Sequence, residues 1–323
     1  MTETASAILI NLVSEQAIPS LVPALDSRFR VDEVILLVSP EMRGRARWLK
    51  RVFKRHELLC SAWPEEVNPF DPRRMEEVFL DLLAELPADR PLLLNATGGT
   101  KIMALTTSNV FAQLNRGEIV YVDTARKRIL YLFPDRSRHY ESQPVISISD
   151  YLTAYGMLPK NPVARWQQGD PLPVISRVTQ YLAQNAATLD LLFGSLNQVG
   201  RQVLGPSRAA EEWPRSAMMR SRPFPSAGKY ASILELLASE GLVEVSGNLV
   251  TFNNEDTARY LSGGWLEEYV YASACRAGAD EVVLSQTVEW EGEGKREVRN
   301  EFDCLAIKDN RLFLIECKTM SLD

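Results

Sequence analysis

Short apolar runs alternate with longer amphipathic stretches over the first third of the chain. Each run is four to seven residues long, as expected for strands of a parallel sheet buried on both faces. The predicted strands are Ala7–Val13, Val34–Val38, Glu57–Ala62, Pro91–Leu94 and Glu118–Val122. Helices are expected from Pro19, from about Glu41, over Asp71–Leu86 and over Thr100–Leu114. This alternation predicts an α/β domain with a mostly parallel sheet, which Arg128–Phe133 extends as an antiparallel hairpin strand.

The middle of the chain has a different pattern. Residues 158–175 are rich in proline and predict a linker, and residues 205–228, which carry four prolines, predict a loop. Helices are expected over Val174–Leu204 and Tyr230–Ser239, the second closed by Gly241. A hairpin is expected from Leu242–Val245 and Leu249–Phe252, which flank Ser246-Gly247-Asn248. Helices followed by a two-stranded wing indicate a small winged-helix module.

The last part of the chain begins with a helix, Gly264–Arg276, and continues with strands. The predicted strands are Glu281–Trp290, Val298–Ile307 and Leu312–Lys318, with a turn at Lys308-Asp309-Asn310. We therefore expect three modules, over residues 1–157, 158–257 and 258–323.

Two carboxylates flank that last turn. Asp303 and Glu316 are 13 residues apart, which is about two strands and their turn, so the two side chains are expected side by side. Glu316 and Lys318 are two residues apart and share a face of a strand. Both strands are apolar around these residues, where a carboxylate is costly unless it is used. Oxygen ligands of this kind suit Mg²⁺ or Mn²⁺, and Glu267 or Glu268 of the preceding helix would complete the set.

A glycine loop follows the fourth strand. Asn95-Ala96-Thr97-Gly98-Gly99-Thr100-Lys101 stands between a strand and a helix, where backbone N–H groups and the helix dipole favour a phosphate. A tight turn with a threonine N-cap is the alternative interpretation. Polar residues also follow the first two strands, among them Ser14, Gln16 and Ser39. Since ligands of open α/β sheets bind at the carboxyl ends of strands, the three loops are expected to form one site.

The C-terminal residues resemble the PD-(D/E)xK nuclease superfamily, in the order helix Glu, strand Asp, strand (D/E)xK. The resemblance implies a restriction-endonuclease-like α/β domain in which Glu267, Asp303 and Glu316 hold the metal and Lys318 joins them in catalysis. The superfamily usually continues with a helix and a strand after the lysine. Only five residues follow Lys318, so we expect this domain to be truncated.

The N-terminal residues resemble the CRISPR-associated Rossmann-fold (CARF) sensor domains, in the subgroup that joins a sensor to a winged helix and a nuclease. The stretch that carries the likeness is NxTGGTKxMA from Asn95 to Ala104, together with Gln16. The resemblance implies a homodimer that binds a cyclic oligoadenylate, often the tetra-adenylate, and then cuts single-stranded RNA, DNA or both in type III CRISPR defence. The ligand-binding residues implied are Ser14, Gln16, Ser39, Asn95, Thr97, Gly98, Gly99, Thr100 and Lys101.

The amino-acid composition excludes several other classes of functional site. Two histidines and four cysteines without a CxxC pair argue against a zinc ribbon or a serine–histidine triad. Neither a membrane span nor a secretion signal is visible, so a cytoplasmic protein is expected. The net charge of −6 argues against nucleic-acid binding when taken whole, yet residues 258–323 carry 13 acidic and 8 basic residues. Bound cations would offset part of that acidity.

The predicted helix that begins near Glu41 is strongly basic. Seven of the residues between 43 and 55 are basic, which is typical of a solvated helix face and, alternatively, of a surface that attracts an anion. Two other functions remain open. One is a non-enzymatic regulator whose winged helix binds DNA, and the other is a ring nuclease that degrades its own cyclic ligand.

Overall fold

The computed structural model describes residues 6–65, 67–209, 211–219, 229–291 and 298–319. The chain divides into two compact units. The first comprises residues 1–161, 287–301 and 307–313, and the second comprises residues 162–286, 302–306 and 314–323. In the described residues, no helix combines the length and apolar character needed to cross a bilayer.

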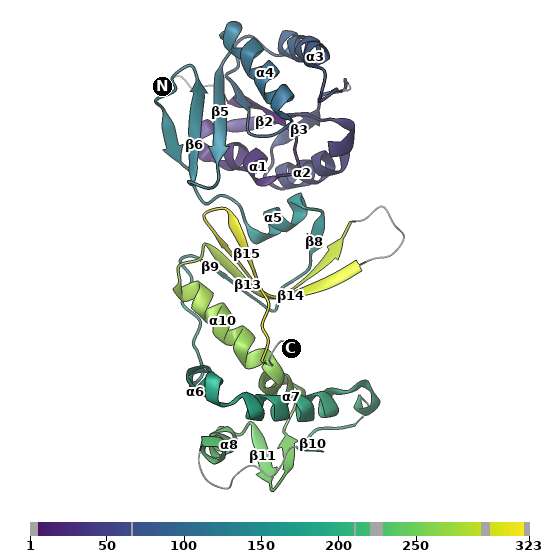
Figure 1. Cartoon of the computed structure of the whole chain (residues 1–323), viewed down its shortest axis with the longest axis vertical. Helices are drawn as coiled ribbons and strands as arrows, with labels where there is room; N and C mark the ends of the chain where they lie inside the picture. The colour runs from purple at the N-terminus through teal and green to yellow at the C-terminus, as the bar shows by residue number, and fades with distance from the viewer. Residues whose placement is uncertain (1–5, 66, 210, 220–228, 292–297, 320–323) are drawn as a thin grey trace. The chain divides into compact units, whose positions relative to one another are not determined.

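A seven-stranded sheet in the order β3-β2-β1-β4-β5-β6-β7 forms the centre of the first unit (Figure 1). The strands are β1 (Ala7–Leu12), β2 (Val31–Leu37), β3 (Leu59–Ala62), β4 (Leu92–Asn95), β5 (Glu118–Asp123), β6 (Arg128–Phe133) and β7 (His139–Glu141). The first five are parallel, and β6 and β7 are antiparallel additions. The predicted α/β class and the antiparallel pairing of β5 with β6 are therefore confirmed.

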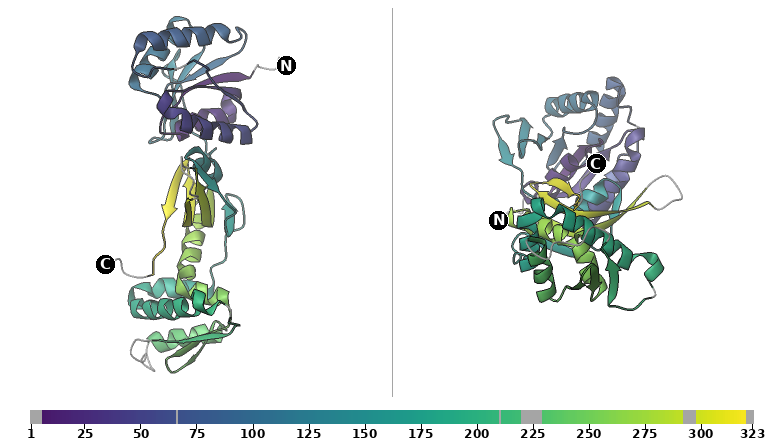
Figure 2. Two further views of the ribbon diagram at one scale, coloured as in Figure 1. Left: turned by 90° about the vertical axis from the view of Figure 1, so that its right-hand side faces the viewer. Right: turned by 60° about the horizontal axis from the view of Figure 1, so that its bottom comes forward.

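Helices cover both faces of this sheet (Figure 2). They are α1 (Ile18–Leu25), α2 (Arg43–Arg55), α3 (Pro72–Glu85) and α4 (Lys101–Gln113). On one face, alternate residues of β1 pack with the apolar sides of α3 and α4, among them Phe79 and Phe111. Every residue of β1 is buried, because α1 and α2 cover the opposite face. Burial on both faces explains why the strands appear as continuous apolar runs.

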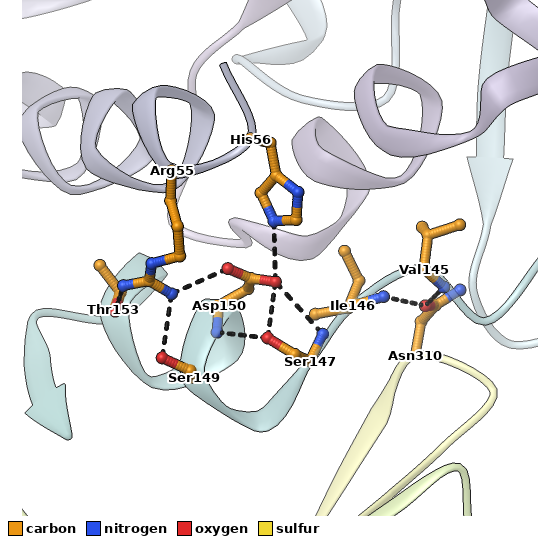
Figure 3. A network of polar contacts seen from close by, with 9 residues as sticks. All are labelled: Arg55, His56, Val145, Ile146, Ser147, Ser149, Asp150, Thr153 and Asn310. Carbon is orange, nitrogen blue, oxygen red and sulfur yellow. Dashed lines mark hydrogen bonds and ion pairs between the residues drawn. The ribbon is translucent and has the colours of Figure 1, made fainter. Parts of the chain in front are cut away.

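A short helix, α5 (Ile148–Ala154), packs on α2 and was not predicted. The Asp150 carboxylate is buried and accepts hydrogen bonds from the Arg55 guanidinium at 2.9 Å and the Ser147 hydroxyl at 2.6 Å, with the His56 ring at 3.0 Å (Figure 3). Arg45 donates to the Ala154 carbonyl at 2.7 Å. The basic run is thus partly an internal docking surface rather than only a solvated face.

The second unit holds the predicted winged-helix elements. Its helices are α6 (Arg177–Asn185), α7 (Asp190–Leu204) and α8 (Lys229–Ser239), and its small sheet has the order β10-β12-β11. The hairpin of β11 (Val243–Ser246) and β12 (Leu249–Phe252) confirms the predicted wing. Two details were wrong. The expected helix over Val174–Leu204 is two helices, and β10 (Arg215–Met218) lies in the expected loop.

Another sheet has the order β15-β14-β13-β8, and β9 also pairs with β13. Its strands are β8 (Met157–Pro159), β9 (Ala164–Gln167), β13 (Glu281–Trp290), β14 (Val298–Lys308) and β15 (Arg311–Ile315). The prediction of a linker over 158–175 was wrong, because β8 and β9 pair antiparallel with β13. Their prolines lie at strand ends or between strands, where no ladder hydrogen bond is lost. The hairpin β14–β15 has residues in both units.

The helix α10 (Trp265–Arg276) precedes these strands, after α9 (Glu255–Arg259) and a π-helical turn, Tyr260–Gly264. Gly263 has a φ of 140° there, which breaks the helical path just before Glu267. Only glycine adopts this backbone conformation readily.

Candidate functional sites

The glycine loop lies on the carboxyl end of β1. A Cβ atom added to Gly98 would lie 2.0 Å from the Leu12 carbonyl oxygen and 3.2 Å from the Ser14 hydroxyl oxygen. Gly99 has a φ of 70°, and Thr100 caps α4 by accepting a hydrogen bond from the Met103 N–H at 3.2 Å. The loop therefore requires glycine at position 98, because its backbone lies against the backbone of Leu12. Lys101 follows the loop and lies exposed in the first turn of α4.

Asn95 lies beneath this loop rather than on its surface. It is 1% exposed, and its amide nitrogen donates to the Asn11 Oδ1 and to the Pro19 carbonyl, both at 2.8 Å. Its Oδ1 accepts from the backbone N–H of Thr97 at 3.1 Å and from the Thr97 hydroxyl at 2.6 Å. The side chain thus ties the loop after β4 to the start of α1.

Asn11 is a residue that the sequence interpretation missed. It is fully buried, lies opposite Asn95 in the β1–β4 ladder and donates to the Ser20 carbonyl at 3.1 Å. The signal was present as a single amide inside the apolar run of the first strand. Buried amides in folded proteins make hydrogen bonds, and those of Asn11 connect β1 to the start of α1 and to Asn95.

The other predicted ligand residues are placed unevenly. Ser14 lies beside Gly98, whereas Ser39 is buried and hydrogen-bonds to the Glu41 carboxylate, which helps to lower the pKa of that carboxyl. Gln16 is exposed and lines two open cavities. One, of about 510 Å³, also has Arg45, Trp48 and Tyr155 in its wall. The second, of about 390 Å³, also has Asn310 and Arg311 of the β14–β15 hairpin in its wall.

Thr97 and Thr100 are likewise engaged within the domain. The Thr97 hydroxyl oxygen accepts a hydrogen bond from the Val122 N–H at 2.8 Å, and the Thr100 hydroxyl donates to the Pro69 carbonyl at 2.6 Å. These two threonines fix the shape of the loop, so Lys101 and the loop backbone are the groups it presents.

The predicted carboxylate pair lies on the β14–β15 hairpin. Asp303 Oδ2 accepts a hydrogen bond from the backbone N–H of Cys317 at 2.7 Å, so the Asp303 carboxylate reaches the residue next to Glu316. The Asn197 amide donates to the Thr319 hydroxyl oxygen at 2.8 Å and holds the segment from its other end. The structure thus brings Asp303 to the Glu316-Cys317-Lys318 segment, as the spacing predicted.

One part of that prediction was wrong. The last strand ends at Ile315, so Glu316 and Lys318 lie just beyond it instead of within a buried strand. The strand β15 lies at the edge of its sheet, and Phe313 and Leu314 are both more than half exposed. The Glu316 and Lys318 side chains are 59% and 51% exposed and form an ion pair at 3.0 Å. This ion pair raises the pKa of the Lys318 ammonium above its ordinary value.

Glu267 of α10 is one of the carboxylates whose charge affects this segment. The pKa of the Cys317 thiol is raised to about 11, first by burial and then by nearby carboxylates, namely Asp303, Glu267 and Glu316. Glu268 acts instead on the Tyr260 hydroxyl, whose pKa burial raises. Across the described part of the chain, no group of three His, Cys, Asp or Glu residues is arranged to hold a metal ion. The donors are nevertheless of the right chemical kind, since hard carboxylate oxygens are the ligands that Mg²⁺ and Mn²⁺ prefer.

Comparisons with protein families assign both parts of the chain. Residues 8–151 match the Card1 CARF domain, and residues 254–323 match the Card1-like endonuclease domain. The chain belongs to the CARF-domain effector nucleases, with a sensor domain of the Card1 type joined to an endonuclease domain of the Card1 type. No match was found among curated proteins.

Solved structures share the fold. Protein VC1899 from Vibrio cholerae is 20% identical with a TM-score of 0.80, and the match covers 97% of this chain and 80% of that one. Can2 from Sulfobacillus thermosulfidooxidans, solved in complex with cyclic tetra-adenylate, is 23% identical with a TM-score of 0.73 and coverages of 98% and 81%. A type III CRISPR defence DNA nuclease activated by cyclic oligoadenylate is 18% identical with a TM-score of 0.52. That match covers 98% of this chain and 40% of the nuclease chain.

Proposed function

We propose that this protein is a metal-dependent endonuclease of type III CRISPR defence, which cuts single-stranded RNA, DNA or both after a cyclic oligoadenylate binds. The observation that carries the proposal is the presence on one chain of a CARF domain and of an endonuclease domain whose Asp303 reaches the Glu316-Cys317-Lys318 segment. Cyclic tetra-adenylate is the ligand of choice, because it is the one bound in the Can2 structure of similar fold.

The chemistry follows from the side chains on the hairpin. Asp303, Glu316 and Glu267 would hold a Mg²⁺ or Mn²⁺ ion, which would polarise the phosphodiester and lower the pKa of a bound water. Lys318 would place its positive charge beside the phosphate and stabilise the negative charge that develops on its oxygens. The hydrogen bond from the Cys317 N–H fixes Asp303 against the segment that carries Glu316, and so sets the separation of the two carboxylates.

Cleavage of labelled single strands tests this proposal. RNA and DNA are incubated with Mg²⁺, Mn²⁺ or a chelator, with and without cyclic tetra-adenylate. We expect cleavage only when both a metal and the ligand are present. Duplex binding without cleavage would support a winged-helix regulator instead, and loss of the cyclic ligand alone would support a ring nuclease.

Lys101 is expected to contribute to ligand affinity. It is exposed at the first turn of α4, where its charge and the helix N-terminus face an anion together. A charge-assisted hydrogen bond to a phosphate contributes about 1.5 to 3 kcal/mol, so Lys101→Ala should weaken binding about tenfold or more. Calorimetry with cyclic tetra-adenylate measures the change. The exposed Lys54 on α2 is the matched control, and equal affinities for the Lys101→Ala and Lys54→Ala variants would contradict the assignment.

We further propose that two copies pair through the outer face of α4. Leu105 on this helix is 72% exposed, and a groove of about 500 Å³ between α4 and β6 is lined by apolar residues such as Ala112 and Leu130 together with the polar Asn109 and Arg136. An apolar side chain exposed to this degree beside an open groove suits a protein contact.

Leu105→Glu should convert a dimer into a monomer, because a charge at a packed apolar contact is costly to bury. Light scattering after gel filtration measures the mass. Leu80→Glu on α3, at a position 41% exposed, is the control. A mass unchanged by Leu105→Glu would exclude α4 as the dimer contact.

A further inference from the structure

The turn between β14 and β15 belongs to the first unit and carries a buried asparagine with four hydrogen bonds. Asn310 is 6% exposed, and its Oδ1 accepts hydrogen bonds from the backbone N–H groups of Val145 and Ile146 at 2.8 and 3.0 Å (Figure 3). Its amide nitrogen donates to the Gln143 carbonyl at 2.6 Å and to the Ser142 hydroxyl oxygen at 3.2 Å. Four hydrogen bonds satisfy the full capacity of this amide, so the turn has one preferred position.

The residues on either side of Asn310 contact a second segment of the same unit, residues 124–127. Lys127 forms an ion pair with Asp309 at 2.6 Å, and Arg311 donates to the carbonyls of Thr124 and Ala125, each at 2.6 Å. These partners belong to the connection between β5 and β6 of the seven-stranded sheet. The turn is therefore fixed to two separate segments of the CARF domain.

The same turn shares a cavity with a predicted ligand residue. Gln16 and Asn310 both line an open cavity of about 390 Å³, together with Tyr151 and Arg311. The cavity places the loop after β1 and the hairpin turn around one space. A group bound in this cavity would contact the loop after β1 and the hairpin turn at the same time.

The two strands that leave the turn carry the carboxylates. Asp303 lies seven residues before Asn310 and Glu316 lies six residues after it. The turn of a hairpin fixes the register of its two strands, and so decides which residues of β14 and β15 lie opposite each other. The hydrogen bond between Cys317 N–H and Asp303 then depends on the register that the turn sets.

We propose that Asn310 is a positioning residue that couples the sensor domain to the nuclease carboxylates. Through its four hydrogen bonds it transmits the state of the Gln16 cavity to Asp303 and Glu316. This inference rests on the proposed function, in which a ligand of the CARF domain activates cleavage. Asn310 acts through the hairpin and takes no part in the chemistry itself.

Asn310→Gly tests this coupling with little disturbance of the turn. Asn310 has a φ of 60°, a conformation that glycine adopts freely, so the variant removes the side chain and leaves the backbone unstrained. Asn115→Gly is the matched control, because Asn115 has a φ of 48° but an exposed side chain.

Two measurements decide the question. The first is the ratio of cleavage at saturating cyclic tetra-adenylate to cleavage without it, which should fall at least tenfold in Asn310→Gly and stay unchanged in Asn115→Gly. The second is hydrogen exchange of the Cys317 amide, which should become at least tenfold faster in Asn310→Gly only. The second result does not depend on nuclease activity.

The possible outcomes separate the two proposals. A wild-type protein that cyclic tetra-adenylate does not stimulate would overturn the proposed function, whereas unchanged exchange at Cys317 in Asn310→Gly would overturn the positioning role. A wild-type stimulation ratio in Asn310→Gly would also overturn the coupling.

Discussion

Glu316→Gln is expected to reduce strand cleavage about a thousandfold while leaving ligand binding intact. The substitution keeps the shape of the side chain and removes the charge that would help to hold a divalent cation. A metal ion contributes several kcal/mol of charge stabilisation, and about 4 kcal/mol corresponds to a thousandfold in rate. Lys318→Met should have a similar effect, because it removes the ammonium that pairs with Glu316 at 3.0 Å.

Single-turnover cleavage at saturating ligand is the appropriate measurement. Glu244→Gln is the matched control, since Glu244 is an exposed carboxylate on β11. Because both nuclease variants change exposed side chains, folding should be preserved, and melting curves can verify this. Full activity in either nuclease variant would show that the β14–β15 hairpin does not contribute to the catalytic centre.

Gly98→Ala is expected to abolish ligand binding and to destabilise the CARF domain by about 3 kcal/mol. The new Cβ atom would lie 2.0 Å from the Leu12 carbonyl oxygen. No side-chain rotation can relieve this clash, because the backbone fixes the position of Cβ and the oxygen is itself a backbone atom. Leu12 ends β1 at the centre of the sheet, so a shift there would disturb the β1–β2 pairing as well. Overpacking of well-packed sites costs about 1 to 3 kcal/mol, and backbone clashes lie at the upper end.

Urea unfolding and calorimetry with cyclic tetra-adenylate measure the two effects of Gly98→Ala. The control is Gly194→Ala in α7, where no atom lies within 4 Å of the added Cβ. That change should leave the free energy of unfolding unchanged or raise it by about 0.5 to 1 kcal/mol. A Gly98→Ala variant as stable as wild type would show that the loop has room at this position.

Much of the fold could be predicted because a strand that is buried on both faces of a sheet appears in the sequence as a continuous apolar run. Four of the five parallel strands of the large sheet contain buried residues and were found from apolar runs, whereas β3, which has no buried residue, was a weaker prediction. The strands β11 and β12 were found from a Gly-containing turn. The strands β8 and β9 were missed because they are three and four residues long and lie among prolines. Their strand character comes from pairing with β13, a contact that no local pattern encodes.

The candidate sites were predictable to a different degree. The 13-residue separation of Asp303 and Glu316 led to the hairpin, since two strands and a turn have a nearly fixed length. The exposure of Glu316 could not be predicted, because an edge strand and a central strand can have the same apolar sequence. The task of Asn310 also escaped prediction, since its four partners are about 165 residues away along the chain.

The paired amides of Asn11 and Asn95 also restrict how this family can diverge. Both side chains are buried and they share a hydrogen bond. An apolar residue at position 95 therefore leaves the Asn11 Oδ1 without its donor, and an apolar residue at position 11 removes an acceptor from the Asn95 amide. Such an unsatisfied group costs about 1 to 3 kcal/mol, whereas replacing both amides together can be nearly neutral. Two successive single substitutions must therefore pass through a weakened intermediate. In an alignment of relatives, the two positions should change together or not at all.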